Sequence, residues 1–258
     1  MPLTRKELLN INQKGWNTVY PIFYGGTALP RYGPLSATET DLNLIDDLTG
    51  QAALELGCGS GHTLQYLWQE KHAAELWGLD FCQEQLRCAG ELLAKESIPA
   101  HLPLASMDEN PGIPEAHFNL VVAIYALGWT PDLPRTLSLV HSYLKPGGKF
   151  VFSWEHPLYH CLEWNDASGQ YIFERSYQVE QPEHIPNWNG VEIILQPRKI
   201  STYINALTAA GLTVERLIES ELNPALIREQ DNDPQKWYSA PRARLVPTTF
   251  IIKAGKPD

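Results

Sequence analysis

Short apolar runs alternate with amphipathic segments through the middle of the chain. The apolar runs at 52–57, 75–80, 101–105, 118–125 and 149–154 have the length of buried strands. The segments at 62–72, 83–96 and 132–144 carry apolar residues at i, i+3 and i+4, which predicts helices. Strands that alternate with helices form parallel sheets covered on both faces. The pattern therefore predicts a doubly wound α/β fold.

The pattern changes on both sides of this core. Thr4-x-x-Glu7 and Ser36-x-x-Glu39 each fit a capping box and predict helix starts near the N-terminus. A predicted helix at about 200–210 ends at Gly211, and the strands at 213–219 and 248–254 follow without a long helix between them, so they should pair antiparallel. We expect a single domain over 1–258, made of an N-terminal helical cap (1–50), a core (51–156), an aromatic-rich insertion (157–198) and a C-terminal helix with a strand pair (199–258).

Composition and charge narrow the function classes. The 258 residues are 43% hydrophobic and 19% charged, which is typical of a globular domain. Thirty acidic residues against twenty basic ones give a net charge of −10, which disfavours binding to a phosphate backbone. No long apolar run or secretory signal is evident, and the four cysteines lack metal-binding spacing. We therefore expect a cytoplasmic protein with no membrane span, no metal and no nucleic-acid partner.

A glycine-rich turn follows the first predicted strand and opens a helix. It runs through Gly57, Gly59 and Gly61, and glycines at such a turn let the backbone approach a ligand closely. Asp80 ends the second predicted strand, where a carboxylate can accept hydrogen bonds from both hydroxyls of a ribose. A dinucleotide is one candidate ligand, although His62 stands where its G-x-G-x-x-G pattern needs a small residue. A turn that binds nothing is the other alternative.

The E-x-G-x-G-x-G arrangement from Glu55 to Gly61 resembles motif I of the class I S-adenosylmethionine-dependent methyltransferases. Residues 144–152, with Leu-Lys-Pro-Gly-Gly at their start, resemble the turn into the family's fifth strand, and residues 118–122 resemble its fourth. The resemblance implies a Rossmann-like seven-stranded sheet of order 3-2-1-4-5-7-6 with strand seven antiparallel, and S-adenosylmethionine as cofactor. Residues 23–34, 124–129 and 153–157 are similar to bacterial small-molecule enzymes of the ubiquinone/menaquinone-methyltransferase-like branch.

The same resemblance implies a set of cofactor contacts. Where the family commonly has Gly-Asp-Ala, this chain has Ser-Met-Asp, so Met107 would pack on the adenine ring and Asp108 would accept from its amine. Tyr24 and Tyr32 would close over the methionine end, with packing of the cap as the alternative for both. The cofactor-binding residues expected in this way are Tyr24, Tyr32, Glu55, Gly57, Cys58, Gly59, Gly61, Asp80, Phe81, Met107, Asp108 and Ile124.

The acceptor pocket should form beside the cofactor, at the carboxyl ends of the strands. His156 is the candidate general base because the ordinary pKa of histidine lies near working pH, and a structural histidine at the strand end is the alternative. The aromatic residues of the insertion form either a lid over the acceptor or a satellite core. The substrate candidates, which follow strands four and five, are Tyr125, Trp129, Trp154 and Glu155.

Methyl transfer from a sulfonium is an in-line displacement, in which orientation supplies much of the acceleration. The leading hypothesis is an S-adenosylmethionine-dependent methyltransferase acting on a small-molecule acceptor. A non-catalytic sensor or scaffold that binds S-adenosylmethionine is the alternative, since it would keep every cofactor feature. Methylation of a nucleic acid or protein is disfavoured because the chain lacks a segment of the Asn-Pro-Pro-Tyr type. A nicotinamide-dependent reductase would need the glycine loop to seat a pyrophosphate.

Overall fold

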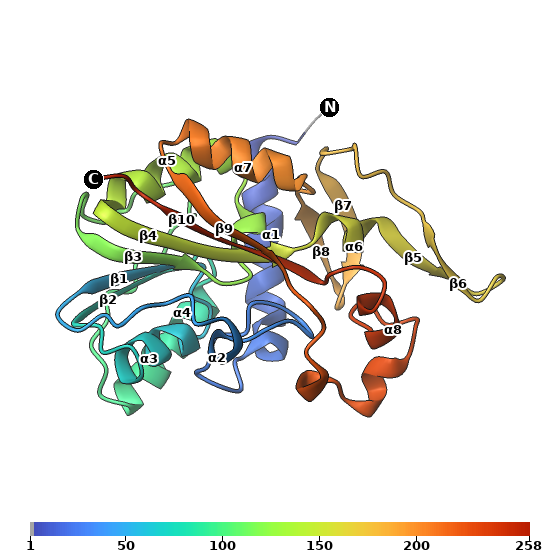
Figure 1. The fold of residues 1–258 in the computed structure, drawn as a ribbon, viewed down its shortest axis with the longest axis horizontal. Helices are drawn as coiled ribbons and strands as arrows, with labels where there is room; N and C mark the ends of the chain where they lie inside the picture. Colours follow the sequence, from blue (N-terminus) through green and yellow to red (C-terminus); the bar gives the residue numbers. More distant parts are fainter. Residues whose placement is uncertain (1–2) are drawn as a thin grey trace.

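The computed structural model describes residues 3–258, and a six-stranded sheet runs through its centre (Figure 1). The spatial order is β2-β1-β3-β4-β10-β9; the first four strands pair in parallel, and β10 runs antiparallel to both β4 and β9. Residues 1 and 2, where the predicted cap begins, lie outside the described residues. The strands are β1 (Ala52–Leu56), β2 (Glu75–Leu79), β3 (Phe118–Ala123), β4 (Leu144–Glu155), β9 (Thr213–Glu219) and β10 (Thr249–Gly255).

The strand predicted at 101–105 is the one correction to the expected sheet. This segment lies beside β2, as the order 3-2-1-4-5-7-6 requires, but it pairs only through isolated bridges, Trp77 with His101 and Asp80 with Leu104. Pro103 lies between these bridges and has no backbone N–H, so it cannot donate to a continuous ladder. The rest of the predicted order and the antiparallel strand are confirmed.

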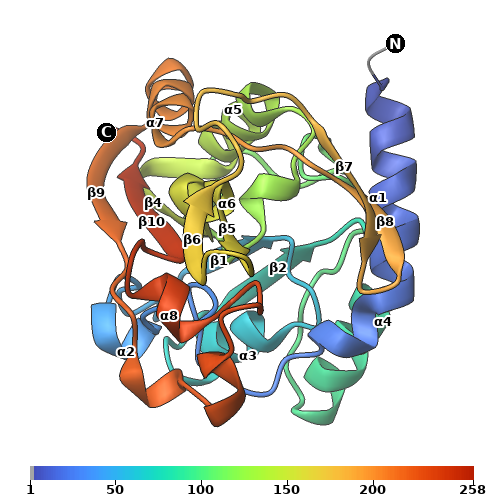
Figure 2. The same ribbon diagram turned by 90° about the vertical axis from the view of Figure 1, so that its right-hand side faces the viewer.

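Helices cover both faces of the sheet (Figure 2). The α3 (His62–Gln69) and α4 (Gln83–Lys95) helices lie on one face, and α5 (Leu133–Tyr143) and α7 (Ile200–Ala209) lie on the other. Successive strand residues point to opposite faces. Leu54 of β1 therefore packs in the core under α5 and α7, whereas its neighbour Ala53 packs in the core against α3 and α4.

The helix ends match the capping residues predicted from the sequence, with one exception. Helix α1 (Arg5–Val19) has the predicted capping box of Thr4 and Glu7, and α7 is followed by Gly211 at φ +84°, as predicted. The box predicted for Ser36 and Glu39 is wrong, because α2 (Glu39–Leu42) is capped by Thr38. The carboxylate of Glu39 is instead drawn inward, where it accepts from the backbone amides of residues 44 and 45.

The insertion forms α6 (Pro157–Cys161) and two hairpins. The β5 (Leu162–Asn165) and β6 (Gln170–Phe173) hairpin projects away from the sheet (Figure 1). The β7 (Glu183–Trp188) and β8 (Val191–Leu195) hairpin runs alongside α1 (Figure 2), and the Asn12 side chain exchanges two hydrogen bonds, of 2.9 and 2.7 Å, with the backbone of Ile194. The cap and this hairpin therefore form one continuous wall.

The chain between β9 and β10 lacks a long helix, as predicted. It contains the 3-10 turns η3 (Pro224–Leu226) and η4 (Glu229–Asn232) and the short α8 (Ala240–Ala243). Tyr159 of α6 packs with Trp237 and Tyr238 of this connection, which ties the insertion to the C-terminal part. Two further 3-10 turns are η1 (Tyr20–Phe23) and η2 (Leu127–Trp129). Within residues 3–258 no helix is long and apolar enough to cross a membrane, and no group of three or more metal-binding side chains comes together.

Candidate active site

A cavity of about 220 Å³ opens at the carboxyl ends of β1, β2 and β3. Gly57 and Gly59 of the glycine loop line it, with φ of +71° and +50°. A Cβ on Gly57 would lie 2.5 Å from the Cβ of Ala126, so a side chain there would collide with the segment after β3. The two glycines therefore keep backbone, and no side chain, on this wall of the cavity.

The rest of the loop faces away from the cavity. Gly61, at φ +81°, precedes α3 and packs against Ala89 of α4, and its contact with the cofactor stays a prediction. The Cys58 thiol lies under Gly78 of β2, where burial raises its pKa well above the ordinary value. Cys58 is thus a small core side chain, and its predicted cofactor contact is not made by its sulfur.

Asp80 lies where the ribose of a nucleoside is expected. It lines the cavity beside Phe81, and its two carboxylate oxygens accept hydrogen bonds from the backbone amides of Gly59, at 2.9 Å, and Cys82, at 2.8 Å. Burial raises the pKa of Asp80 to about 6, although these amide bonds act in the opposite direction. The carboxylate therefore joins the end of β2 to the glycine loop.

Glu55, the acid of the motif, does not line the cavity. Its side chain is buried beneath the loop, and burial raises its pKa well above the ordinary value. The contact between Glu55 and a cofactor therefore stays a prediction, and in this structure the side chain is not part of the cavity wall.

Met107 and Asp108, the two residues predicted at the adenine, separate in the structure. Met107 lines the cavity with Ala105. The Asp108 carboxylate instead forms a two-pronged ion pair with Arg5 of α1, at 2.6 Å and 2.9 Å. Its role as acceptor for the adenine amine stays a prediction, and in this structure its oxygens bind Arg5 of the cap.

The two cap tyrosines also lie off the cavity. Tyr32 is fully buried, and its hydroxyl donates to Glu39 at 2.5 Å, so it belongs to the core and not to a cofactor lid. Tyr24 is 48% exposed and meets the ring of His62 edge-on, at 5.1 Å between centroids. Neither tyrosine lines the cavity in this conformation. For Tyr32, the burial and the bond to Glu39 favour the alternative, packing within the cap.

On the acceptor side, Ile124, Tyr125 and Trp129 line the cavity, as expected from their place after β3. Trp154 stands behind them, with its ring 5.1 Å from Tyr125 and 5.7 Å from Trp129. It covers Gly128, where any Cβ would overlap the indole. Trp154 therefore packs behind the acceptor wall, and its contact with a substrate stays a prediction.

The structural alternative describes His156 better than catalysis does. The ring is buried, with Nε2 2.9 Å from a Glu219 carboxylate oxygen, and Nδ1 accepts from the backbone amide of Leu158 to cap α6. Both nitrogens are thus in use, and the ring does not line the cavity. His156 as general base stays a prediction, and these contacts favour its structural alternative.

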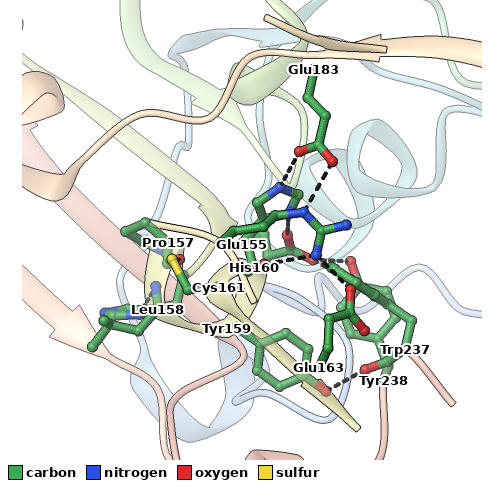
Figure 3. Close-up of polar contacts among 12 residues, drawn as sticks. Glu155, Pro157, Leu158, Tyr159, His160, Cys161, Glu163, Glu183, Trp237 and Tyr238 are labelled. Carbon is green, nitrogen blue, oxygen red and sulfur yellow. Dashed lines mark hydrogen bonds and ion pairs between the residues drawn. The ribbon is translucent and has the colours of Figure 1, made fainter. Parts of the chain in front are cut away.

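Glu155 is also structural. Its carboxylate accepts from the Trp237 indole at 2.8 Å and the Tyr238 hydroxyl at 2.8 Å, and it lies 3.2 Å from Nδ1 of His160. Figure 3 shows these contacts converging, with His160 between Glu155 and Glu183. The residue predicted to touch substrate therefore joins the end of β4 to the insertion and to the C-terminal connection.

This network makes stability depend on pH. Burial alone would lower the pKa of His160, but its bonds to Glu155 and Glu183 outweigh burial and raise the pKa to about 9. The charged imidazole thus stabilises the fold fully below the unfolded pKa of about 6.5, and this contribution is lost as pH rises through about 9. We expect urea titrations from pH 6.5 to 9.5 to show a loss of roughly 1–3 kcal/mol that His160→Asn abolishes. The same loss in the wild type and in His160→Asn would contradict the pairing of His160 with Glu155 and Glu183.

Sequence reasoning missed six residues that line the cavity: Trp16, Phe23, Leu79, Gln85, Ala105 and Ala126. Trp16 and Phe23 come from the cap and pack together at 5.0 Å, and Trp188 of the β7–β8 hairpin stacks on Phe23 at 5.0 Å. Gln85 lies in the first turn of α4, five residues after Asp80. The position of Gln85 at the start of the helix after Asp80 could have indicated that it lies near the ligand. No local sequence pattern indicated this for Trp16.

Comparisons with known proteins agree with this geometry. A family model described as a methyltransferase domain matches residues 37–217. An uncharacterized protein of Haemophilus influenzae is 30% identical over 210 residues, covering 74% of this chain and 81% of that protein. The trans-aconitate 2-methyltransferase of Deinococcus radiodurans is 32% identical over 231 residues, covering 81% of this chain and 84% of the relative.

The structural comparison gives the same family. The crystal structure of an S-adenosylmethionine-dependent methyltransferase from Mesorhizobium loti superposes with a TM-score of 0.63 and 26% identity, covering 83% of this chain and 94% of the other. By contrast, the chain spans only 27% of the length of a mitochondrial arginine-hydroxylase from Rattus norvegicus, with 35% identity over 102 residues. The family model covers more than half of the chain. In this chain, the glycine loop and Asp80 meet at one cavity. The chain therefore belongs to the S-adenosylmethionine-dependent methyltransferase family.

Proposed function

We propose that this protein transfers a methyl group from S-adenosylmethionine to a small-molecule acceptor. One observation carries the proposal: Gly57, Gly59 and Asp80, the cofactor elements, line the same cavity as Tyr125 and Trp129 on the acceptor side. When bound, S-adenosylmethionine supplies an electrophilic methyl carbon on a positively charged sulfur. A cofactor and an acceptor that share one cavity satisfy the orientation requirement of a direct displacement.

The residues of the cavity fit this cofactor. Asp80 would accept hydrogen bonds from the ribose hydroxyls, while Phe81 and Met107 would pack on the adenine. Gln85 is 3% exposed, and its Oε1 has no hydrogen-bond partner within residues 3–258. A buried acceptor without a donor is costly, so a hydroxyl or ammonium of the cofactor would relieve it.

The enclosure of the cavity supports a small acceptor. Trp16, Phe23 and Trp129 form an aromatic wall around about 220 Å³, which suits a small organic molecule better than a polymer. The relative from Deinococcus radiodurans is named for trans-aconitate, which is a small molecule. A non-catalytic sensor would keep the cofactor residues, but it would not need an acceptor wall beside them.

Label transfer tests the proposal. The pure protein is incubated with methyl-labelled S-adenosylmethionine and a bacterial extract divided into small-molecule, protein and nucleic-acid fractions. We expect label in the small-molecule fraction only, with heat-inactivated protein as the control. Label in the protein or nucleic-acid fraction would show that the acceptor is a macromolecule. Binding of the cofactor without transfer to any fraction would favour the non-catalytic sensor.

A further inference from the structure

A second cavity, of about 190 Å³, shares no lining residue with the cofactor cavity. One of its walls comes from the cap segment 31–35. The other comes from the connection between β9 and β10, through Leu226, Arg228, Asp231 and Tyr238. None of these residues takes part in the proposed methyl transfer, so this cavity is a separate candidate binding site.

Hydrogen bonds join the two walls of this second cavity. The carbonyl of Leu35 accepts from the backbone N–H of Asn223 at 2.9 Å, and the hydroxyl of Ser220 accepts from the backbone N–H of Ala37 at 2.9 Å. Leu35 is also buried and packs in one apolar cluster with Tyr238. The cavity therefore lies between two segments that the fold holds against each other.

Arg31 and Arg228 bring positive charge to this cavity, one from each wall. Both residues are exposed, and within residues 3–258 neither guanidinium forms an ion pair. Other arginines of the chain do pair with carboxylates: Arg5, Arg87, Arg175 and Arg242. In a chain with a net charge of −10, two arginines without such partners at one cavity are suited to an anionic ligand.

The carboxylate of Asp231 also lines the cavity, but its oxygens are engaged within its own turn. One oxygen accepts from the backbone N–H of Arg228 at 2.8 Å, and the other lies 3.6 Å from Nζ of Lys236. Because the Lys236 ammonium offsets the charge of Asp231, the cavity keeps an excess of positive charge from its two arginines.

The lining indicates the chemistry of the ligand. A guanidinium is a planar fork of N–H donors that matches the oxygens of a phosphate. Two such groups suit a phosphate monoester, whose charge at pH 7 is about −1.5 to −2. Leu35, Leu226 and Tyr238 add apolar surface to the same cavity, which suits an organic body attached to the phosphate.

We propose that the second cavity binds a small organic phosphate. Arg31 and Arg228 hold the phosphate group, and the organic body packs against Leu35, Leu226 and Tyr238. This binding site goes beyond the proposed methyl transfer and does not depend on it.

Calorimetric titration of phenyl phosphate at pH 7.5 and low salt tests the proposal, with and without saturating S-adenosylhomocysteine. We expect one-to-one binding with a Kd below about 1 mM in both titrations, and about tenfold weaker binding of inorganic phosphate, which lacks the apolar body. No saturable binding of phenyl phosphate, or equal affinity for inorganic phosphate, would overturn the proposal. Loss of binding in the presence of S-adenosylhomocysteine would also overturn it, because the phosphate would then occupy the cofactor cavity.

The two arginines are tested by matched variants. Arg31→Gln and Arg228→Gln each remove one exposed guanidinium, and we expect each to weaken the binding of phenyl phosphate about tenfold, since a charge-assisted hydrogen bond is lost. Arg135→Gln is the control, because this exposed arginine of α5 carries the same charge and lines neither cavity. Unchanged affinity in either cavity variant would overturn the site. An equal loss in Arg135→Gln would also overturn it, by showing that net charge alone attracts the ligand.

Discussion

Asp80→Asn is expected to weaken the binding of S-adenosylhomocysteine about 10- to 100-fold. The asparagine keeps the shape of the side chain but removes the charge that would accept both ribose hydroxyls, and losing a charge-assisted hydrogen bond costs about 1.5–3 kcal/mol. Calorimetric titration at pH 7.5 measures this effect directly. Because burial raises the pKa of Asp80 to about 6, wild-type affinity should also fall as pH drops through about 6, since the carboxyl must lose its proton before the ribose binds.

The matched control for this variant is Asp108→Asn. Its carboxylate is paired with Arg5 and does not line the cavity, so the affinity for S-adenosylhomocysteine should stay within about threefold. Unchanged affinity in Asp80→Asn would overturn the assignment of Asp80. A large loss in Asp108→Asn would restore the role that sequence reasoning gave to that residue.

Glu155→Gln is expected to lower the free energy of unfolding by about 3 kcal/mol. The carboxylate is buried among three donors, from His160, Trp237 and Tyr238, and removing one partner of a buried ion pair leaves the other charge uncompensated. A glutamine also directs an N–H₂ group at partners that donate. Urea unfolding at pH 6.5, where His160 is charged, gives the largest difference from the wild type.

Glu215→Gln is the control for this second variant. Glu215 of β9 pairs with Lys149 of β4, and both side chains are about one-third exposed. Such pairs contribute about 0–1 kcal/mol, so the expected loss is correspondingly small. Equal losses in the two variants would contradict the structural role of Glu155.

The glycine loop and the strand ends were predictable because local sequence determines them. A parallel sheet brings the carboxyl ends of its strands to one edge, so Gly57, Asp80, Met107 and Tyr125 had to meet once the strands were assigned. The exception within the sheet is also local, since Pro103 interrupts the predicted third strand.

Three of the predicted site residues lie outside the cavity lining, and the sequence could not show why. Asp108, His156 and Glu155 look free in the sequence, but each is engaged by a group from a distant segment: Arg5 for the first, Glu219 for the second, and the pair Trp237 and Tyr238 for the third. No periodicity or spacing reports such partners. A polar residue at a strand end therefore indicates the edge of the site, and only its hydrogen-bond partners decide whether it serves the ligand or the fold.

Trp16 and Gln85 show the converse case. Both lie on amphipathic helices, where apolar or half-buried positions are ordinarily explained by packing. Their place on the cavity wall becomes visible only in the folded chain.

The proposed methyl transfer requires that this cavity bind a sulfur-containing nucleoside, and paired titrations test this requirement most directly. S-adenosylhomocysteine and NAD are titrated separately into the wild-type protein by calorimetry at pH 7.5. We predict saturable one-to-one binding of S-adenosylhomocysteine in the micromolar range and no saturable binding of NAD. Saturable binding of NAD together with no binding of S-adenosylhomocysteine would contradict the account.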